Sequence, residues 1–187
     1  VQKVAKALEV TKTVTLPDAQ AARAAAFLIT MAEGATLHLD RLRQRPDDFD
    51  PEVRDRLLAG TMLPAVWVER AQKLRRVFRE RVLKLFDGVD AILAPATPMK
   101  APLLGQKTAM FGGVELPVRP NLGIFTQPLS FIGLPVATVP VWQYGEDLPL
   151  GVQVIAAPWR EDVCLRIAHQ LETAGVCKAL VAQGFAD

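Results

Sequence analysis

Serine, cysteine and histidine are scarce in this chain of 187 residues, which contains one serine, two cysteines and two histidines. Cys164 and Cys177 do not have CxxC spacing, and no histidines cluster with them in the sequence. This pattern argues against a zinc site or a disulfide framework. We expect two free thiols, buried or half-buried, in a protein of the reducing cytoplasm. No metal ion and no organic cofactor are expected.

The single serine lacks the companions that a nucleophile needs. A serine hydroxyl attacks a carbonyl only when a neighbouring group takes its proton. No motif links His38 or His169 to Ser130, and Ser130 follows Pro128 in a position typical of the lead into a strand. We therefore assign no catalytic residue in this chain, and we assign His169 a structural role.

Long apolar runs and an excess of charge of one sign are also missing. Residues 24–32 form the longest largely apolar stretch, far short of the ~20 residues that a membrane-spanning helix needs. The net charge of +2 gives no general attraction to nucleic acid or to an anionic membrane. A basic cluster within residues 73–81 could belong to a nucleic-acid-binding helix, but its interleaved acids and apolar stripe favour a solvated outer helix.

The first half of the chain has mainly helical patterns. The chain opens on apolar residues at helical spacing, as if a helix had begun earlier, which suggests a fragment, a processed chain or an engineered boundary. Residues 10–16 alternate in the manner of a short strand, and residues 40–50 are dense in charge and predict a surface loop. Helices are expected over residues 1–8, 17–39, 51–58 (closed by Gly60) and 61–86, the last being the longest.

The second half changes to short apolar runs bounded by proline and glycine, typical of strands covered on both faces. These runs are AILA (91–94), PVATVPV (135–141) and GVQVIAA (151–157). Between the first two, residues 95–124 predict a long irregular loop, and such loops are usually functional or disordered. A helix over residues 161–174 with Gly175 as its cap completes an α/β pattern.

Five motifs follow one another in an order that resembles the carboxyl-terminal half of amidase signature enzymes. They are AEGATLHL (32–39), DPEVRDRLLAG (50–60), DAILAPATP (90–98), FTQPLSFIGLPVATVPV (125–141) and LPLGVQVIA (148–156). The resemblance implies an α/β/α sandwich with a mixed central sheet, of which residues 1–187 would be the carboxyl-terminal portion of a single amidase domain.

The resemblance also implies hydrolysis of a linear amide by a serine nucleophile, a second serine in a cis peptide and a lysine. Backbone donors then stabilise the oxyanion of the tetrahedral intermediate. Those residues lie in a glycine- and serine-rich stretch of the family's amino-terminal half, and the nearest local match, Gly112-Gly113, contains no serine. The implied partners are therefore the missing amino-terminal amidase half and a small amide substrate.

Substrate contacts can be assigned more readily, because the family's segment before the FT-x-P motif approaches the active site. Here that segment is RPNLGIFTQP (119–128). The candidate substrate-binding residues are Arg119, Asn121, Phe125, Thr126, Gln127 and, from the end of the alanine-rich helix, His38.

One departure within this segment bears on the substrate. The amidase components of glutamine-using transamidosomes commonly have an acidic residue two positions before the Phe, suited to an α-ammonium group. This chain has Gly123 there, which favours a plain amidase. Arg119 then becomes a candidate for binding a substrate carboxylate, since a guanidinium can donate two parallel hydrogen bonds to the two oxygens of that group. The alternative is a surface arginine paired with a nearby acid.

The alanine-rich helix and the GIFTQPLSFIGLPV stretch most resemble amidases of the biuret and cyanuric-acid degradation route. Those enzymes act on carboxylated ureas and work with a small partner subunit, so a small accessory subunit or a homodimer is a possible assembly. Allophanate-type and general aliphatic amidases are competing subgroups. A different hypothesis is a noncatalytic domain that kept the amidase scaffold and binds a partner or a small amide.

Overall fold

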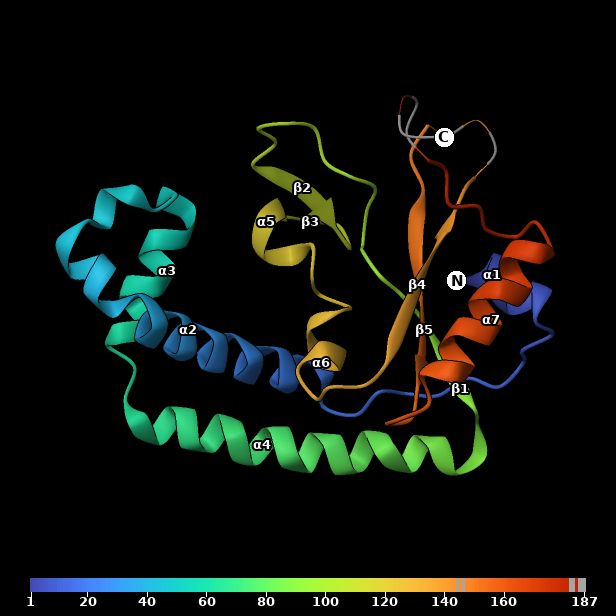
Figure 1. Cartoon of the computed structure of the whole chain (residues 1–187), viewed down its shortest axis with the longest axis horizontal. Helices are drawn as coiled ribbons and strands as arrows, with labels where there is room; N and C mark the ends of the chain where they lie inside the picture. Colours follow the sequence, from blue (N-terminus) through green and yellow to red (C-terminus); the bar gives the residue numbers. More distant parts are fainter. Residues whose placement is uncertain (144, 146, 182–183, 185–187) are drawn as a thin grey trace. The chain divides into compact units, whose positions relative to one another are not determined.

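The computed structural model describes residues 1–143, 145, 147–181 and 184 (Figure 1). The chain forms two compact units. The first contains Val1–Thr15 and the residues from Leu83 onward, and the second contains Leu16–Val82.

A three-stranded sheet is the centre of the first unit. Its strands are β1 (Ala91–Pro95), β4 (Val136–Val141) and β5 (Leu150–Ala156), in the order β1-β5-β4. The three apolar runs are thus strands, as predicted. Both pairings are antiparallel, so the parallel part of a mixed sheet would need strands other than these. Only the central strand β5 is buried along most of its length, from Val152 to Ala156.

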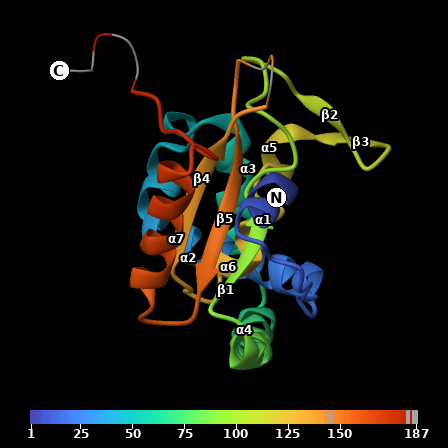
Figure 2. The ribbon, with the colours of Figure 1, turned by 90° about the vertical axis from the view of Figure 1, so that its right-hand side faces the viewer.

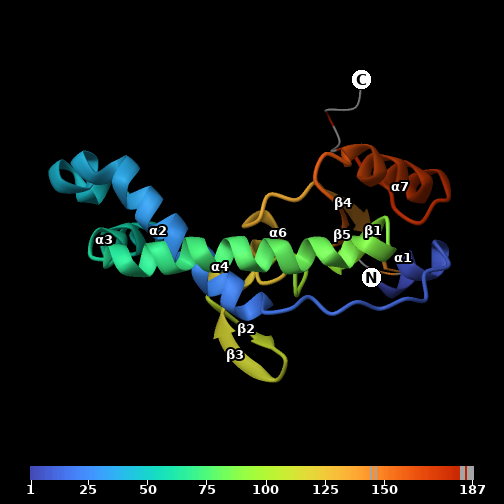
Figure 3. The ribbon, with the colours of Figure 1, turned by 90° about the horizontal axis from the view of Figure 1, so that it is seen from below.

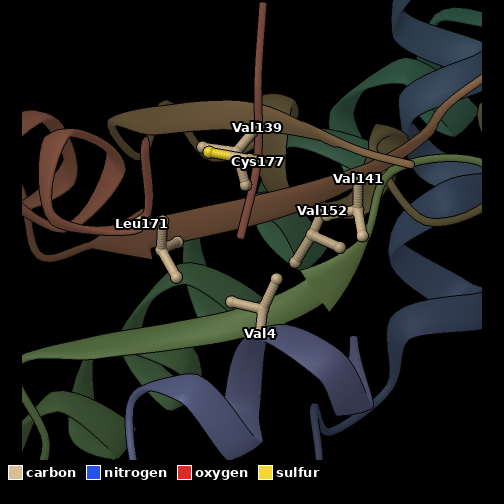
Figure 4. Packing of buried hydrophobic residues seen from close by; sticks show 6 residues of the cluster. All are labelled: Val4, Val139, Val141, Val152, Leu171 and Cys177. Carbon is tan, nitrogen blue, oxygen red and sulfur yellow. The ribbon is translucent and has the colours of Figure 1, made fainter. Parts of the chain in front are cut away.

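One face of this sheet packs against helices α1 (Gln2–Ala7) and α7 (Glu161–Thr173). Because strand side chains alternate between faces, Val152 of β5 and Val139 of β4 point to the same side. The buried cluster on that side consists of Val4, Val139, Val141, Val152, Leu171 and Cys177 (Figure 4). Figure 2 shows α7 running beside β4 and β5. Burial of each of these valine or leucine side chains contributes about 1.5–3 kcal/mol.

The predicted cap of the last helix is confirmed. Gly175 has φ of +67°, a conformation that glycine adopts without a Cβ clash. The amides of Gly175 and Val176 donate to the carbonyls of Glu172 and Leu171, 2.9 Å in each case. These bonds satisfy carbonyls that the end of a helix leaves unpaired.

The segment 95–124 is not irregular throughout, which corrects the predicted loop. It contains a hairpin of β2 (Thr108–Phe111) and β3 (Val114–Pro117), followed by the short helix α5 (Val118–Asn121) (Figures 1 and 2). The hairpin forms because Gly112 and Gly113 have φ of +58° and +86°. Two such residues make the tight turn that matches the twist of antiparallel strands.

The second unit is helical (Figure 3). Its elements are α2 (Ala19–Gln44), the 3-10 turn η1 (Pro46–Asp48), α3 (Pro51–Thr61) and α4 (Ala65–Leu83), and the turn η2 (Lys84–Gly88) follows in the first unit. In the described ranges of the chain, none of the helices is long and apolar enough to cross a membrane.

Several predicted helix boundaries were wrong. α2 continues through the charged residues up to Gln44, because arginine, leucine and glutamine favour a helix and only Pro46 prevents its continuation. α4 begins after Pro64, so α2 and not α4 is the longest helix. Residues 10–16 pair with no strand in the described chain, since β-branched residues form a strand only where a partner is available.

The apolar stripe predicted for α4 is partly confirmed. Phe78 and Val82 are fully buried, whereas Trp67 at the other end of the helix is 51% exposed. The spacing of apolar residues therefore predicted the buried face correctly at the carboxyl end of α4 but not at Trp67.

Helices α2 and α3 pack closely through glycines. Gly60 lies within α3, so it does not close the helix as predicted. A Cβ atom built on Gly60 would lie 2.2 Å from the carbonyl oxygen of Met31 in α2. At Gly34 of α2, by contrast, the nearest atom is the side-chain Cδ2 of Leu57, at 2.8 Å. A side chain at position 60 would therefore clash with the backbone of α2. A side chain at position 34 would meet only the side chain of Leu57, which can move.

This difference predicts different effects on stability for two alanine substitutions. Gly60→Ala should lower the free energy of unfolding by about 1–3 kcal/mol, because two helix backbones must move apart. Gly34→Ala should be close to neutral, since Leu57 can rotate and alanine favours the helix by about 1 kcal/mol over glycine. Denaturant unfolding of both variants measures the difference, and equal stabilities would contradict the assigned role of Gly60.

Candidate functional site

The segment expected to approach the substrate consists of helical turns. α5 is followed by a turn and then by α6 (Gln127–Ser130). Backbone amides of Leu122, Gln127 and Ser130 donate to the carbonyls of Val118, Gly123 and Thr126, at 2.9–3.1 Å. We call residues 118–132 the pocket segment. Many backbone amides of the pocket segment thus donate to carbonyls within the segment itself. It therefore has a defined shape and is not the open loop expected from its glycine and prolines.

Gln153 on β5 attaches the pocket segment to the sheet. Its side chain is 2% exposed. Its Nε2 atom donates to the carbonyl oxygens of Pro95, at 2.8 Å, and Phe125, at 3.2 Å. An amide nitrogen has two hydrogens and can donate to both. Gln153 points to the face opposite Val152, so the pocket segment is held on the face of the sheet that α7 does not cover.

Gln153 was not among the functional residues predicted from the sequence. The available signal was a single polar residue inside the apolar run GVQVIAA. A buried polar side chain normally needs hydrogen-bond partners, so this position was a candidate for a structural contact. Its two partners lie 58 and 28 residues away in the sequence, which no local pattern could indicate.

Five of the six candidate residues lie together on the pocket segment. Arg119 and Asn121 belong to α5, Phe125 and Thr126 to the turn, and Gln127 begins α6. Asn121 Nδ2 donates to the carbonyl of Pro117 at 2.9 Å, and Thr126 Oγ1 donates to that of Gly123 at 3.3 Å. Arg119 is exposed and the side chain of Phe125 is partly so. The polar groups of Asn121 and Thr126 thus brace the turns on which Arg119 and Phe125 are displayed.

Gly123 and Gln127 are adjacent within these turns. A Cβ atom on Gly123 would lie 3.2 Å from Cγ and 3.4 Å from Nε2 of Gln127. The side chain of Gln127 therefore lies over Gly123, in space that any side chain at position 123 would need. A larger residue there would require Gln127 to take another rotamer.

The sixth candidate, His38, belongs to α2 in the second unit. It lies inside the helix and not near its end as expected, because α2 continues to Gln44. Its ring packs edge-on against Phe49, with centroids 5.6 Å apart. A hollow between α2, α3 and the turn after α3 is lined mainly by alanine and leucine, with Arg43 as its charged residue, and His38 is not among its lining residues.

Ser130 ends α6 and does not lead into a strand, which corrects the expected position. Its hydroxyl donates to the carbonyl of Gln127 at 3.3 Å. The serine therefore caps its own helical turn, a common use of a serine hydroxyl in proteins. The residues after it reach β4 through Gly133, whose φ is +67°.

Comparisons with known proteins identify the family to which this fold belongs. The chain belongs to the amidase family, whose model matches residues 1–165. It is 46% identical over 179 residues to AtzE, the 1-carboxybiuret hydrolase subunit of Pseudomonas sp. (strain ADP). It is 36% identical over 149 residues to one of the subunits of the glutamyl-tRNA(Gln) amidotransferase of Geobacter metallireducens.

A solved structure agrees with these sequence relatives. This chain superposes over 96% of its length, with a TM-score of 0.92 and 45% identity, on one chain of a solved protein complex. That complex is described as vestigial and as revealing the evolutionary origins of an s-triazine catabolic enzyme, and this structure is its inhibitor-bound form. The matched chain of that complex is covered for 40% of its length. The alignments cover 95% and 76% of this chain but 39% of AtzE and 30% of the amidotransferase relative. This chain thus has the amidase fold and spans less than half the length of these relatives.

The described residues contain no group of three or more His, Cys, Asp or Glu side chains that could hold a metal ion. The two cysteines are free and buried, as predicted. Cys164 Sγ donates to the carbonyl of Val154 at 3.3 Å. Burial raises the pKa of both the Cys164 and the Cys177 thiols above the ordinary value, because a low-dielectric surrounding disfavours the thiolate.

Both thiols should therefore react slowly. Thiolate is the reactive form, and each thiol is both buried and shifted toward the neutral form. We expect alkylation of the folded protein by iodoacetamide at pH 8 to be at least tenfold slower than in denaturant for both cysteines, as measured by peptide mass spectrometry. Equal rates in the two conditions would show that the cysteines are accessible and unshifted.

Proposed function

We propose that this chain is the carboxyl-terminal part of a C–N hydrolase that acts on a linear amide or urea-type substrate. The similarity to a 1-carboxybiuret hydrolase subunit, which extends over nearly the whole chain, is the observation that carries the proposal. The reaction uses a Ser-Ser-Lys mechanism whose residues precede this chain. The nucleophile attacks the substrate carbonyl, and preorganised donors stabilise the oxyanion that forms.

In this proposal the chain supplies part of the substrate pocket. Arg119, Asn121, Phe125, Thr126 and Gln127 line it from the pocket segment. The exposed guanidinium of Arg119 on a braced turn supports a role in binding a substrate carboxylate, because two parallel hydrogen bonds fix both charge and orientation. The partly exposed ring of Phe125 provides an apolar wall.

Gly123 distinguishes this pocket from one that uses glutamine. An α-ammonium group needs an acidic partner, and the space beside Gly123 is occupied by the uncharged side chain of Gln127. The carboxamide of Gln127 can donate to and accept from a urea-type group. These features favour a carboxylated urea over glutamine, although glutamyl-tRNA amidotransferase subunits are among the relatives of this chain.

The proposed partners are the amino-terminal amidase half and either a small accessory subunit or a second copy. The similar structure solved as a protein complex supports an assembly of this kind. The protein works in the cytoplasm without a metal ion or an organic cofactor, and nucleic acid and membranes are not partners. The alternative is a noncatalytic amidase-like domain that binds a partner or a small amide. A coding frame extending upstream of Val1 into a Gly-Ser-Ser-rich stretch would exclude that alternative.

This proposal predicts that the 187-residue chain by itself hydrolyses no amide, because the residues that break the bond lie outside it. Ammonia release from simple amides, biuret and carboxylated ureas should equal that of a buffer blank. Turnover by the purified chain that is lost in Ser130→Ala would contradict the proposal.

A second prediction concerns Arg119 in the full-length enzyme. A charge-assisted pair with a substrate carboxylate contributes about 1.5–3 kcal/mol, so Arg119→Ala should lower kcat/KM for a carboxylated substrate by roughly ten- to a hundredfold. Arg119→Lys should recover part of the loss, because lysine supplies charge without the planar fork.

The measurement compares a carboxylated substrate with a neutral amide of similar size. The loss should be confined to the carboxylated substrate. Arg166→Ala, which removes another exposed guanidinium on α7, serves as the control and should leave both substrates unaffected. Equal losses on the two substrates, or no loss on either, would show that Arg119 does not bind the substrate carboxylate.

A further inference from the structure

We propose that Gln153 is a positioning residue, whose carboxamide fixes the pocket segment at the carbonyl of Phe125 and so sets where the substrate-contacting side chains lie. This inference rests on the proposed function for its catalytic consequence. Its structural part, the attachment of the pocket segment to β5, can be tested without any substrate.

The first observation is that Gln153 is the one buried polar side chain in the part of the chain that the structure describes. It lies in the middle of β5, opposite Ala94 of β1 and Thr138 of β4. An amide in such a place loses its hydration on folding, and it is tolerated only where hydrogen bonds replace the lost water. Both of its amide hydrogens are used, on the carbonyls of Pro95 and Phe125.

The second observation is that neighbouring contacts leave this strand little freedom. A Cβ atom on Gly151 would lie 2.8 Å from Cβ of Ala96 and 2.9 Å from Cγ2 of Thr138. The amide of Ala96 also donates to the carbonyl of Gly151 at 2.9 Å. β5 is therefore held firmly between its neighbours, and a side chain from it is a rigid support for whatever it binds.

The third observation is the position of the accepting carbonyl. Phe125 lies between α5 and α6, so a bond to its backbone holds the joint between the turns that carry Arg119 and Gln127. Loss of this bond would let the joint move, and the hydrogen bonds of the short helical turns on either side would then open more often. A displacement of about 1 Å at a site that orients a substrate can lower a rate by about a hundredfold.

Two substitutions separate hydrogen bonding from packing. Gln153→Met keeps the length and volume of the side chain but cannot donate. Gln153→Glu keeps the shape and donates one hydrogen bond only when it is protonated. Facing two carbonyl oxygens in a buried position, this carboxyl should have a pKa above that of the unfolded chain. The bond should therefore be present at low pH and be lost as the pH rises through the folded-state pKa.

The experiment uses the full-length protein and measures two quantities. The first is hydrogen–deuterium exchange, corrected for intrinsic rates, where Gln153→Met should speed exchange in the pocket segment at least tenfold and leave the amides of β5 unchanged. In Gln153→Glu the protection should return only in part as the pH falls, because the single carboxyl proton can bond only one of the two carbonyls at a time. The second is kcat/KM for a carboxylated urea, relative to wild type at each pH, which should fall roughly ten- to a hundredfold in Gln153→Met and recover at low pH in Gln153→Glu.

Thr138→Val is the matched control, since Thr138 lies opposite Gln153 on the same face but is exposed. It should behave as wild type in both measurements. Unchanged exchange in the pocket segment of Gln153→Met would overturn the inference. If the wild-type protein cleaves no carboxylated urea, the proposed function fails, and the exchange measurement still decides whether Gln153 holds the segment.

Discussion

The hydrogen bonds around β5 are the constraint on which the first unit depends. β5 pairs with β1 on one side and β4 on the other, and its alternating side chains serve different purposes. Val152 and Val154 pack into the apolar layer under the helices, whereas Gln153 points the other way and binds backbone at Pro95 and Phe125. One strand therefore fixes both the core and the segment that displays the candidate substrate contacts.

The two compact units stabilise themselves by different means. The first relies on strand pairing and on apolar side chains brought together from α1, β4, β5 and α7. The second relies on the close approach of α2 and α3, in which Gly60 lies against the backbone near Met31. Ser130 is the only serine in the sequence, and its hydroxyl donates within its own turn, so the proposed mechanism takes no serine from either unit.

The sequence predicted the sheet and the last helix well because their signals are local. The apolar runs around Val139 and Val154 are bounded by proline and glycine, and Gly175 follows a helical pattern directly. The failures have physical causes too. Charge density before Pro46 resembled a loop, although arginine and glutamine are good helix formers. The turns of the pocket segment depend on backbone bonds such as that from Gln127 to Gly123, which a stretch rich in proline and glycine does not indicate.

The sequence by itself determined the family, because the order of the five motifs can be recognised without knowing any contact in the structure. It also led to the proposal that the catalytic residues lie elsewhere, because Ser130 is the only serine here. Only the tertiary structure decided that Gln153 holds Phe125, that Gln127 covers Gly123, and that Gly60 serves packing and not helix termination. The reason is that contacts between distant residues depend on how elements pack in three dimensions, whereas periodicity and composition report only on neighbours along the chain.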